Sequence, residues 1–177
     1  MPPVRPVATP FETDRLRLRE LVHDDAAFVL EMVNDPAWLA NVGDRRVRSL
    51  DDACRYVDRV REGSYERHGF GLWLVEPRAG GEPVGMAGMV QRVVLPCPDV
   101  GFAFLERHRG QGYAREAVAG TLRVASEVFG VTQVAAIVGA AHAPSRRVVE
   151  GNGFVNQTDC RGAAPGETLA FPERGLP

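Results

Sequence analysis

The chain has 177 residues, which suits one domain of ordinary size with a sizeable hydrophobic core. Its hydrophobic content of 45% and charged content of 25% are those of an average soluble globular protein. A formal net charge of −2 argues against a protein that binds nucleic acid through phosphate contacts. No apolar run approaches the roughly 20 residues of a membrane span, so we expect no membrane partner.

The cysteines Cys54, Cys97 and Cys160 are widely spaced and form no C-x-x-C pair. They indicate reduced packing residues rather than a disulfide framework, and with scattered histidines they predict no metal site. The proline-rich residues 1–10 lack the apolar region of a signal peptide, which predicts a flexible tail on a cytoplasmic protein. All 21 basic residues are arginine, which we interpret as GC-rich, bacterial codon usage.

The first third of the chain predicts one strand and two helices. Leucines alternate with arginines over 13–21, which is typical of a half-buried strand. The first helix is expected to end before Pro36, and the second to begin at a capping box that starts with Ser49. Trp38 is expected in an irregular segment between them.

The rest of the chain predicts six more strands and two helices. The expected strands are 72–76, 84–91, 99–105, 134–138, 154–158 and 168–171, and the expected helices are 112–130 and 144–150. The order β-α-α-β-β-β-α-β-α-β-β predicts an α/β fold with a mixed sheet and helices on both sides.

Two glycines open the predicted long helix directly after the strand 99–105. Gly110 and Gly112 would let the backbone approach a ligand, while the unpaired amides of the first helical turn favour an anion such as phosphate. The alternative is a plain strand-to-helix turn. A Rossmann fingerprint is excluded because Arg115 replaces its third glycine, and a Walker loop is excluded because the chain has no lysine.

Three motifs in register resemble the GCN5-related N-acetyltransferases, the GNAT superfamily, and especially its ribosomal-protein N-terminal acetyltransferase branch. The opening T-D-R-L-R-L-R at 13–19 is similar to the first strand of that branch. Arg107-x-x-Gly110-x-Gly112 fits the family's R/Q-x-x-G-x-G/A loop. Glu150-x-x-Gly153-Phe154 matches its helix-to-strand corner. The resemblance covers about 11–154.

The resemblance implies a single GNAT domain over 1–177, with 1–10 as a flexible tail. Its fold would be a mixed, mostly antiparallel central sheet flanked by helices, with the strands 99–105 and 134–138 splayed around acetyl-CoA as co-substrate. The Phe104 backbone would hold the pantetheine amides. The residues expected to wrap the pyrophosphate are Arg109, Gly110, Gln111, Gly112, Tyr113 and Ala114.

Two departures from the branch concern the site. His142 stands where relatives carry an asparagine that touches the cofactor, and a histidine ring can still donate one hydrogen bond there. Val149 stands where many relatives place a tyrosine that protonates the departing thiolate. Ser145, one turn earlier on the same helix face, is the nearest substitute by position.

Acetyl transfer to an amine also needs a base and a polarised thioester carbonyl. Asp99, at the strand edge, is the first candidate base, and its alternative reading is a turn aspartate after Pro98. Glu20 is the second candidate. A bulge between Gly101 and Phe104 could free the polarising backbone amide.

Three functions compete at this point. The first is an N-acetyltransferase acting on a peptide N-terminus or an amine-bearing small molecule. The second is an acyl-CoA-binding protein without transfer activity. The third is an antibiotic-modifying acetyltransferase of the same fold. We favour the first, expect no nucleic-acid partner, and leave a homodimer as an open option.

Overall fold

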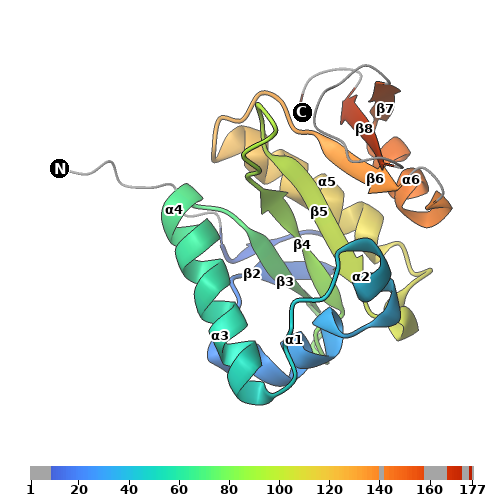
Figure 1. The fold of residues 1–177 in the computed structure, drawn as a ribbon. Helices are drawn as coiled ribbons and strands as arrows, with labels where there is room; N and C mark the ends of the chain where they lie inside the picture. Colours follow the sequence, from blue (N-terminus) through green and yellow to red (C-terminus); the bar gives the residue numbers. More distant parts are fainter. Residues whose placement is uncertain (1–8, 140–141, 158–166, 173–175, 177) are drawn as a thin grey trace.

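The computed structural model describes residues 9–139, 142–157, 167–172 and 176, and it confirms a mixed, mostly antiparallel α/β fold flanked by helices (Figure 1). The strands are β1 (Phe11–Glu12), β2 (Leu16–Arg19), β3 (Leu72–Pro77), β4 (Gly85–Val90), β5 (Asp99–Phe104), β6 (Ala136–Gly139), β7 (Phe154–Gln157) and β8 (Glu167–Pro172). The helices are α1 (Ala26–Val33), α2 (Pro36–Asn41), α3 (Leu50–Val60), α4 (Glu66–His68), α5 (Tyr113–Glu127) and α6 (Ala143–Glu150). Two 3-10 turns, η1 (His23–Asp25) and η3 (Glu106–His108), and a π-helical turn, η2 (Arg61–Tyr65), complete the set.

The first sheet contains β1 to β5 in chain order, all antiparallel. In β2, Leu16 and Leu18 are fully buried, as the leucine and arginine alternation predicts. The strand is shorter than the expected 13–21, because the Thr13 amide donates to the Leu16 carbonyl at 2.9 Å and the resulting turn separates β1 from β2.

Helices cover both faces of this sheet. Trp73 and Val75 of β3 belong to the core beneath α5, whereas Leu74 between them packs in the core beneath α1 and α3. Figure 1 shows α5 behind the sheet and α1 and α3 in front of it. Each fully buried side chain of this kind contributes about 1.5–3 kcal/mol, so both cores anchor the central strands.

The second sheet has the order β6-β8-β7 and is antiparallel throughout. The closing strand expected at 168–171 therefore exists, and it lies in the centre of this sheet rather than at its edge. One neighbour, β7, is the preceding strand, whereas the other, β6, lies before α6 in the sequence, and a local sequence pattern does not encode this second pairing.

Within the described residues, the two sheets meet at one parallel bridge, between Asp99 and Ala135. There the Val100 amide donates to the Ala135 carbonyl at 2.8 Å, and the Ala135 amide donates to the Pro98 carbonyl at 2.9 Å. Beyond this bridge, no further hydrogen bond joins β5 to β6 within the described residues, and Figure 1 shows the two strands separating. The predicted splayed strand pair is present.

Two helical segments differ from the prediction. Trp38 lies in the short helix α2, which Asp35 caps by accepting from the Ala37 amide while Pro36 occupies the first helical turn. The helix that begins at Ser49 continues through the π-helical turn η2 into α4 and ends at Gly69, whose φ is 82°. In the part of the chain that is described, no helix is long and apolar enough to span a bilayer.

Candidate active site

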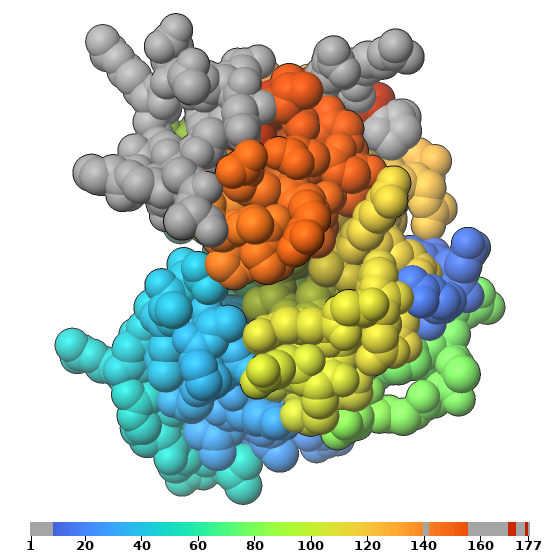
Figure 2. Space-filling view, turned by 90° about the vertical axis from the view of Figure 1, so that its right-hand side faces the viewer, coloured from blue at the N-terminus to red at the C-terminus, as the bar shows by residue number. Residues whose placement is uncertain are grey.

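A cleft of about 1580 Å³ opens where β5 and β6 separate. Figure 2 shows the hollow between the cyan region of α2, the orange region of α6 and the yellow loop before α5, with β5 at its floor. Of the candidate residues for catalysis and cofactor binding, all except Gln111 and Glu20 line it. The lining candidates are Asp99, Phe104, Arg109, Gly110, Gly112, Tyr113, Ala114, His142 and Ser145.

Both glycines of the loop have left-handed backbone conformations, with φ of 75° at Gly110 and 81° at Gly112. A side chain is strained at such a φ, which explains glycine at both positions. A Cβ at Gly110 would meet nothing within 4 Å, whereas one at Gly112 would lie 3.3 Å from Nη2 of Arg15. Gly112 is the N-cap of α5, so the free amides of the first helical turn open toward the cleft.

Arg15 of the opening motif, for which the sequence predicted no role in the site, contacts this loop and the first turn of α5. Its Nη1 donates to the Gln111 carbonyl at 2.9 Å, and its Cζ lies 4.9 Å from the centroid of the Tyr113 ring. Its Nε donates to Glu116 in the first turn of α5 at 2.6 Å, and the Thr13 hydroxyl donates to the same carboxylate at 2.6 Å. Gln111 therefore contributes a structural carbonyl outside the cleft.

These contacts also set the charge state of Glu116. Burial on its own would raise the pKa of this carboxyl, but the hydrogen bonds from Thr13 and Arg15 outweigh burial and lower it. The carboxylate form holds Arg15 of the opening motif against the first turn of α5, 101 residues away in the sequence.

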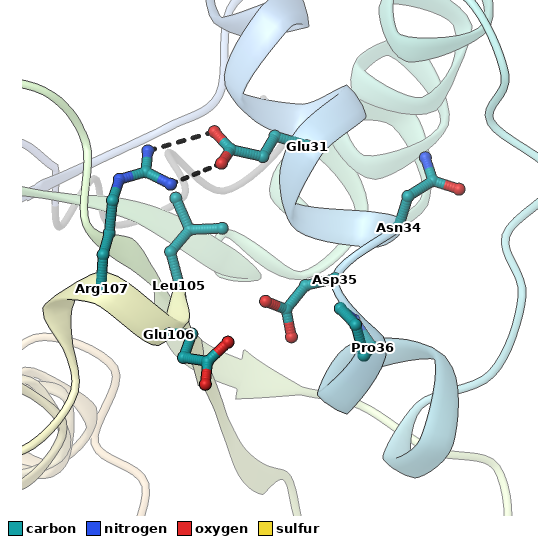
Figure 3. A pocket seen from close by; sticks show the side chains of 7 residues that line it. All are labelled: Glu31, Asn34, Asp35, Pro36, Leu105, Glu106 and Arg107. Atoms are coloured by element: carbon teal, nitrogen blue, oxygen red, sulfur yellow. Dashed lines mark hydrogen bonds and ion pairs between the residues drawn. The ribbon is translucent and has the colours of Figure 1, made fainter.

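Arginines also fix the other end of the loop. Nε of Arg109 donates to the Phe104 carbonyl at 2.8 Å, and its Nη2 donates to Asp35 at the start of α2 at 2.9 Å. Arg107 bonds Glu31 of α1 and Glu82 of the β3–β4 turn, at 3.1 and 3.0 Å. Figure 3 shows the Arg107–Glu31 pair at a separate pocket of about 500 Å³. Both arginines tie the loop to neighbouring elements.

The predicted bulge in β5 is wrong. The register from Val90–Asp99 to Gly85–Phe104 is uninterrupted, and the Leu105 amide donates to the Val84 carbonyl at 3.1 Å. Backbone groups alternate along an antiparallel strand, so those of Phe102 and Phe104 point away from β4 toward the opening left by β6. Divergence of β6 rather than a bulge frees them. Gly101 instead allows close packing, since a Cβ there would lie 3.1 Å from Leu72.

His142 caps α6. Its Nδ1 accepts a hydrogen bond from the Ser145 amide at 3.2 Å, which is the contact an asparagine oxygen would make at an N-cap. Because Nδ1 is the acceptor, the proton of the neutral ring resides on Nε2. Nε2 of His142 can therefore donate a hydrogen bond to a group outside α6. Ser145 lies in the first turn of α6, three residues after His142.

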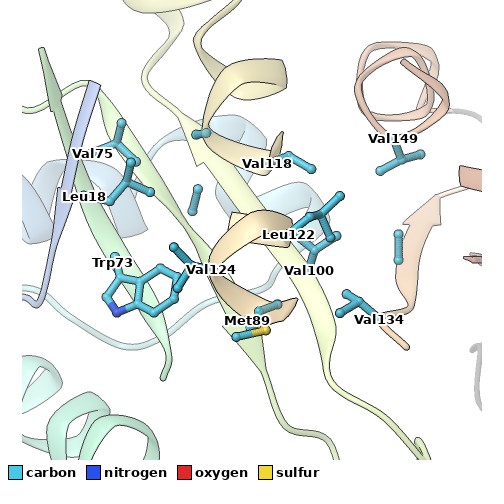
Figure 4. Close-up of a cluster of buried hydrophobic side chains, with 14 of the residues drawn as sticks. Leu18, Trp73, Val75, Met89, Val100, Val118, Leu122, Val124, Val134 and Val149 are labelled. Atoms are coloured by element: carbon cyan, nitrogen blue, oxygen red, sulfur yellow. The ribbon is translucent and has the colours of Figure 1, made fainter. Parts of the chain in front are cut away.

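Val149 does not offer any chemistry to the cleft. Its side chain is 2% exposed and points from α6 into the hydrophobic cluster that contains Val118, Leu122 and Val134 (Figure 4). Position 149, where the resemblance led us to compare a tyrosine, is a packing position in this chain.

Asp99 lies at the bridge to Ala135, where β5 and β6 begin to separate (the closed end of the splay), and its side chain is 2% exposed. Its carboxylate accepts from Nε of Arg92 at 2.8 Å, and both side chains line the cleft. The second candidate base, Glu20, does not line the cleft. Burial, followed by the charge of Glu66, raises the pKa of Glu20. Within the described residues, no group of three or more His, Cys, Asp or Glu side chains could hold a metal ion.

Comparison with known proteins identifies the class that this fold and cleft define. The family model of the GNAT acetyltransferase domain matches residues 15–155, so the chain belongs to the GNAT family of acetyltransferases. An uncharacterized protein of Bacillus subtilis, YkkB, is 28% identical over 148 residues, which cover 80% of this chain and 83% of YkkB.

Solved structures agree on the fold. An acetyltransferase from Agrobacterium tumefaciens superposes with a TM-score of 0.79 at 21% identity, covering 93% of this chain and 94% of that one. A ribosomal-protein-S5-alanine acetyltransferase from Vibrio fischeri (TM-score 0.71, 17% identity, covering 91% and 94%) has the same fold. So does a spermidine N-acetyltransferase from Vibrio cholerae, solved with CoA and spermine (TM-score 0.69, 14% identity, covering 90% and 94%).

Proposed function

We propose that this chain transfers an acetyl group from acetyl-CoA directly to a primary amine, in the cleft between β5 and β6. The observation that carries the proposal is that the splay and the glycine loop open into the same cleft. The strands leave peptide groups unpaired within the described chain, and the loop presents helix-terminal amides at positions where only glycine fits without strain. Such a surface fits a long ligand with amides at one end and phosphates at the other.

The pyrophosphate would be held by the backbone of Gly110, Gly112, Tyr113 and Ala114 at the start of α5, which needs no particular side chain. Arg109 holds the start of the glycine loop through its hydrogen bonds to Phe104 and Asp35, and its Nη1 could donate to a phosphate oxygen. Arg115 lines the mouth of the cleft beside α6 and supplies further positive charge there.

The pantetheine arm would lie along β5. The amide of Phe104 can donate to one of its carbonyls, while the carbonyl of Phe104 already accepts from Arg109. His142 can donate from Nε2 on the opposite wall, because Nδ1 serves the helix cap. The arm would thus add the strand contacts that β6 does not make.

The bound co-substrate supplies an activated thioester. The amine lone pair forms a C–N bond to the carbonyl carbon, the C–S bond breaks, and its electron pair leaves on sulfur. One proton lost by the amine balances the thiol released. The Phe102 amide is the first one beyond the Asp99–Ala135 bridge that β6 does not engage, and it can polarise the carbonyl.

Asp99 remains our proposed proton acceptor for the amine, acting through water from the closed end of the splay. Its pairing with Arg92 keeps the carboxylate in place beside the cleft. Val149 has no proton to give, so the sulfur leaves as thiolate or takes a proton from Ser145 or water. A coenzyme A thiol resembles a cysteine, with a pKa of about 8.5, which makes the thiolate a tolerable leaving group.

The acceptor class is the finer part of the proposal. The resemblance to ribosomal-protein acetyltransferases favours a peptide N-terminus, while the neighbour named for spermidine favours a small amine. Both neighbours share less than 25% identity with this chain, so they agree on the fold and leave the acceptor open.

The test is release of free thiol from acetyl-CoA, measured with a panel of amines and short peptides and with a no-acceptor control. We expect thiol release that depends on at least one primary amine. Saturable acetyl-CoA binding without consumption by any amine would instead establish the non-catalytic acyl-CoA-binding protein, which Val149 favours.

A further inference from the structure

We infer that the acceptor is a primary amine that also carries a carboxylate or phosphate, and that Arg45, Arg46 and Arg59 bind this anionic group. The inference rests on the proposed function, because it assigns the acceptor half of the same cleft. The evidence is the placement of these three arginines and the absence of ion-pair partners for them within the described chain.

The arginines line the cleft on the side formed by α3 and by the segment that precedes it. Arg45 and Arg46 belong to the segment between α2 and α3, and Arg59 belongs to α3; all three line the cleft. Helix α3 packs on the sheet face opposite α5. A ligand bound at the start of α5 and a ligand bound by these arginines would therefore approach the splay from opposite faces.

The carboxylates on this side of the cleft are already engaged. Asp44 pairs with Arg48 at 2.6 Å and also accepts from the Arg46 amide at 2.7 Å. The Asp52 carboxylate accepts from the Arg48 amide, the Arg55 guanidinium and the Ser49 hydroxyl, and these contacts lower its pKa to about 2. Neither carboxylate is left for an ammonium group of a polycation.

By contrast, no ion pair is present for Arg45, Arg46 or Arg59 anywhere in the described part of the chain, and all three are exposed. Their guanidinium forks match carboxylate and phosphate oxygens, which they can bind with two parallel hydrogen bonds. The charge of Arg46 acts on the nearby Asp44, whereas Arg45 and Arg59 have no ion pair in the described chain, so this side of the cleft carries positive charge that a ligand can meet.

Two aromatic residues support an anionic ligand. Tyr56 lines the cleft beneath Arg59, whose Cζ is 5.8 Å from the ring centroid. Burial raises the pKa of the Tyr56 hydroxyl, with Arg45 and Arg59 opposing it, so the hydroxyl stays neutral and can donate. Trp38 also lines the cleft, and its indole Nε1 is buried without an acceptor in the described chain. Both groups are suited to oxygen-rich ligands.

The test compares amines that differ in one anionic group. The pairs are phosphoethanolamine with ethanolamine, β-alanine with β-alaninamide, and a C-terminally amidated tripeptide with an acidic second residue against the same peptide with that residue as its amide. Spermidine serves as the polycation. Binding is measured by calorimetry on protein saturated with CoA, and turnover by thiol release. The three pairs separate a phosphate, a free amino acid and a peptide as the source of the anion.

The variants are Arg45→Gln and Arg59→Gln, with Arg67→Gln as the matched control. Arg67 is an exposed arginine of α4 that does not line the cleft. We expect the anionic member of at least one pair to bind more tightly than its partner and than spermidine. Arg45→Gln and Arg59→Gln should each weaken that binding about tenfold, while Arg67→Gln and the affinity for acetyl-CoA stay unchanged.

The inference would be overturned if the amines that lack the anionic group, or spermidine, bound as tightly as the anionic amines or more tightly. Equal effects of Arg59→Gln and Arg67→Gln on binding would also overturn it. Failure of every anionic amine to bind at millimolar concentration would overturn it too. These outcomes leave acetyl-CoA binding and transfer intact, whereas loss of the proposed function itself would appear as no acetyl-CoA binding by the unmodified chain.

Discussion

The amide of Val100 donates to the carbonyl of Ala135 at 2.8 Å, and this contact is the point at which β5 and β6 cease to be one sheet. Beyond it, the peptide groups of β5 face a cleft instead of a neighbouring strand. Because buried peptide groups need hydrogen-bond partners, the opening is a site that a ligand with amides of its own can complete.

The glycine loop provides the first prediction. Gly110→Ala should cost about 1–2 kcal/mol of stability, because φ is 75° at this residue, and it should also weaken acetyl-CoA binding more than tenfold. Gly130→Ala is the matched control, since its φ is 62° and a Cβ there also meets nothing within 4 Å. It should lose similar stability and keep its affinity. Equal affinity losses in both variants would show that the loop has no special role.

The second prediction concerns the histidine cap of α6. His142→Ala should lower the melting temperature, since losing an N-cap costs about 1 kcal/mol, and it should weaken acetyl-CoA binding. His142→Asn restores both an acceptor for the Ser145 amide and a donor for the ligand, so it should bind at least as well as the parent. Thermal melts separate the cap from the contact. If all three forms bind acetyl-CoA equally, the ring does not touch the ligand.

The third prediction assigns the proton transfers. Asp99→Asn should lower turnover, with recovery as pH rises and the amine deprotonates unaided. Ser145→Ala should lower turnover only modestly, by less than the roughly 10²–10⁴-fold typical of general acid–base catalysis, because thiolate leaves readily. A pH–rate profile with one identified acceptor measures both. A profile of Asp99→Asn that matches the parent at every pH would place the base elsewhere.

The fourth prediction uses the carboxylate that ties the opening strand to α5. The pKa of Glu116 is lowered in the folded chain, so its contribution to stability is fully present above about pH 4.3 and is lost as pH falls through the folded value. The difference in free energy of unfolding between the parent and Glu116→Gln should therefore be largest near neutrality and shrink in acid. Urea titrations at pH 7 and pH 3.5 measure it, and a difference that grows in acid contradicts the assignment.

Periodicity and turn residues predicted the element order and the glycine loop, because both are local properties of the sequence. The short helix α2 also had a local signal, the Asp35-Pro36 start, which the irregular reading of Trp38 overlooked. The central position of β8 had no such signal, since it depends on pairing with β6, which lies before α6 in the sequence.

Among the residues of the proposed site, the sequence indicates best those whose backbone conformation restricts residue type. Gly110 and Gly112 are such residues, because few residue types tolerate their positive φ. Arg15 was not predicted, because its partner Glu116 lies 101 residues away and both side chains look like ordinary surface charges in the sequence. The grouping of Arg45, Arg46 and Arg59 and the Asp99–Arg92 ion pair were likewise not predicted, because both depend on how the folded chain places these side chains.

A calorimetric titration of the unmodified chain with acetyl-CoA tests whether the cleft between β5 and β6 binds this co-substrate. We expect one saturable site per chain, with affinity weakened more than tenfold by Gly110→Ala and unchanged by Gly130→Ala. If no binding is detected up to millimolar acetyl-CoA, the cleft does not serve as an acetyl-CoA site.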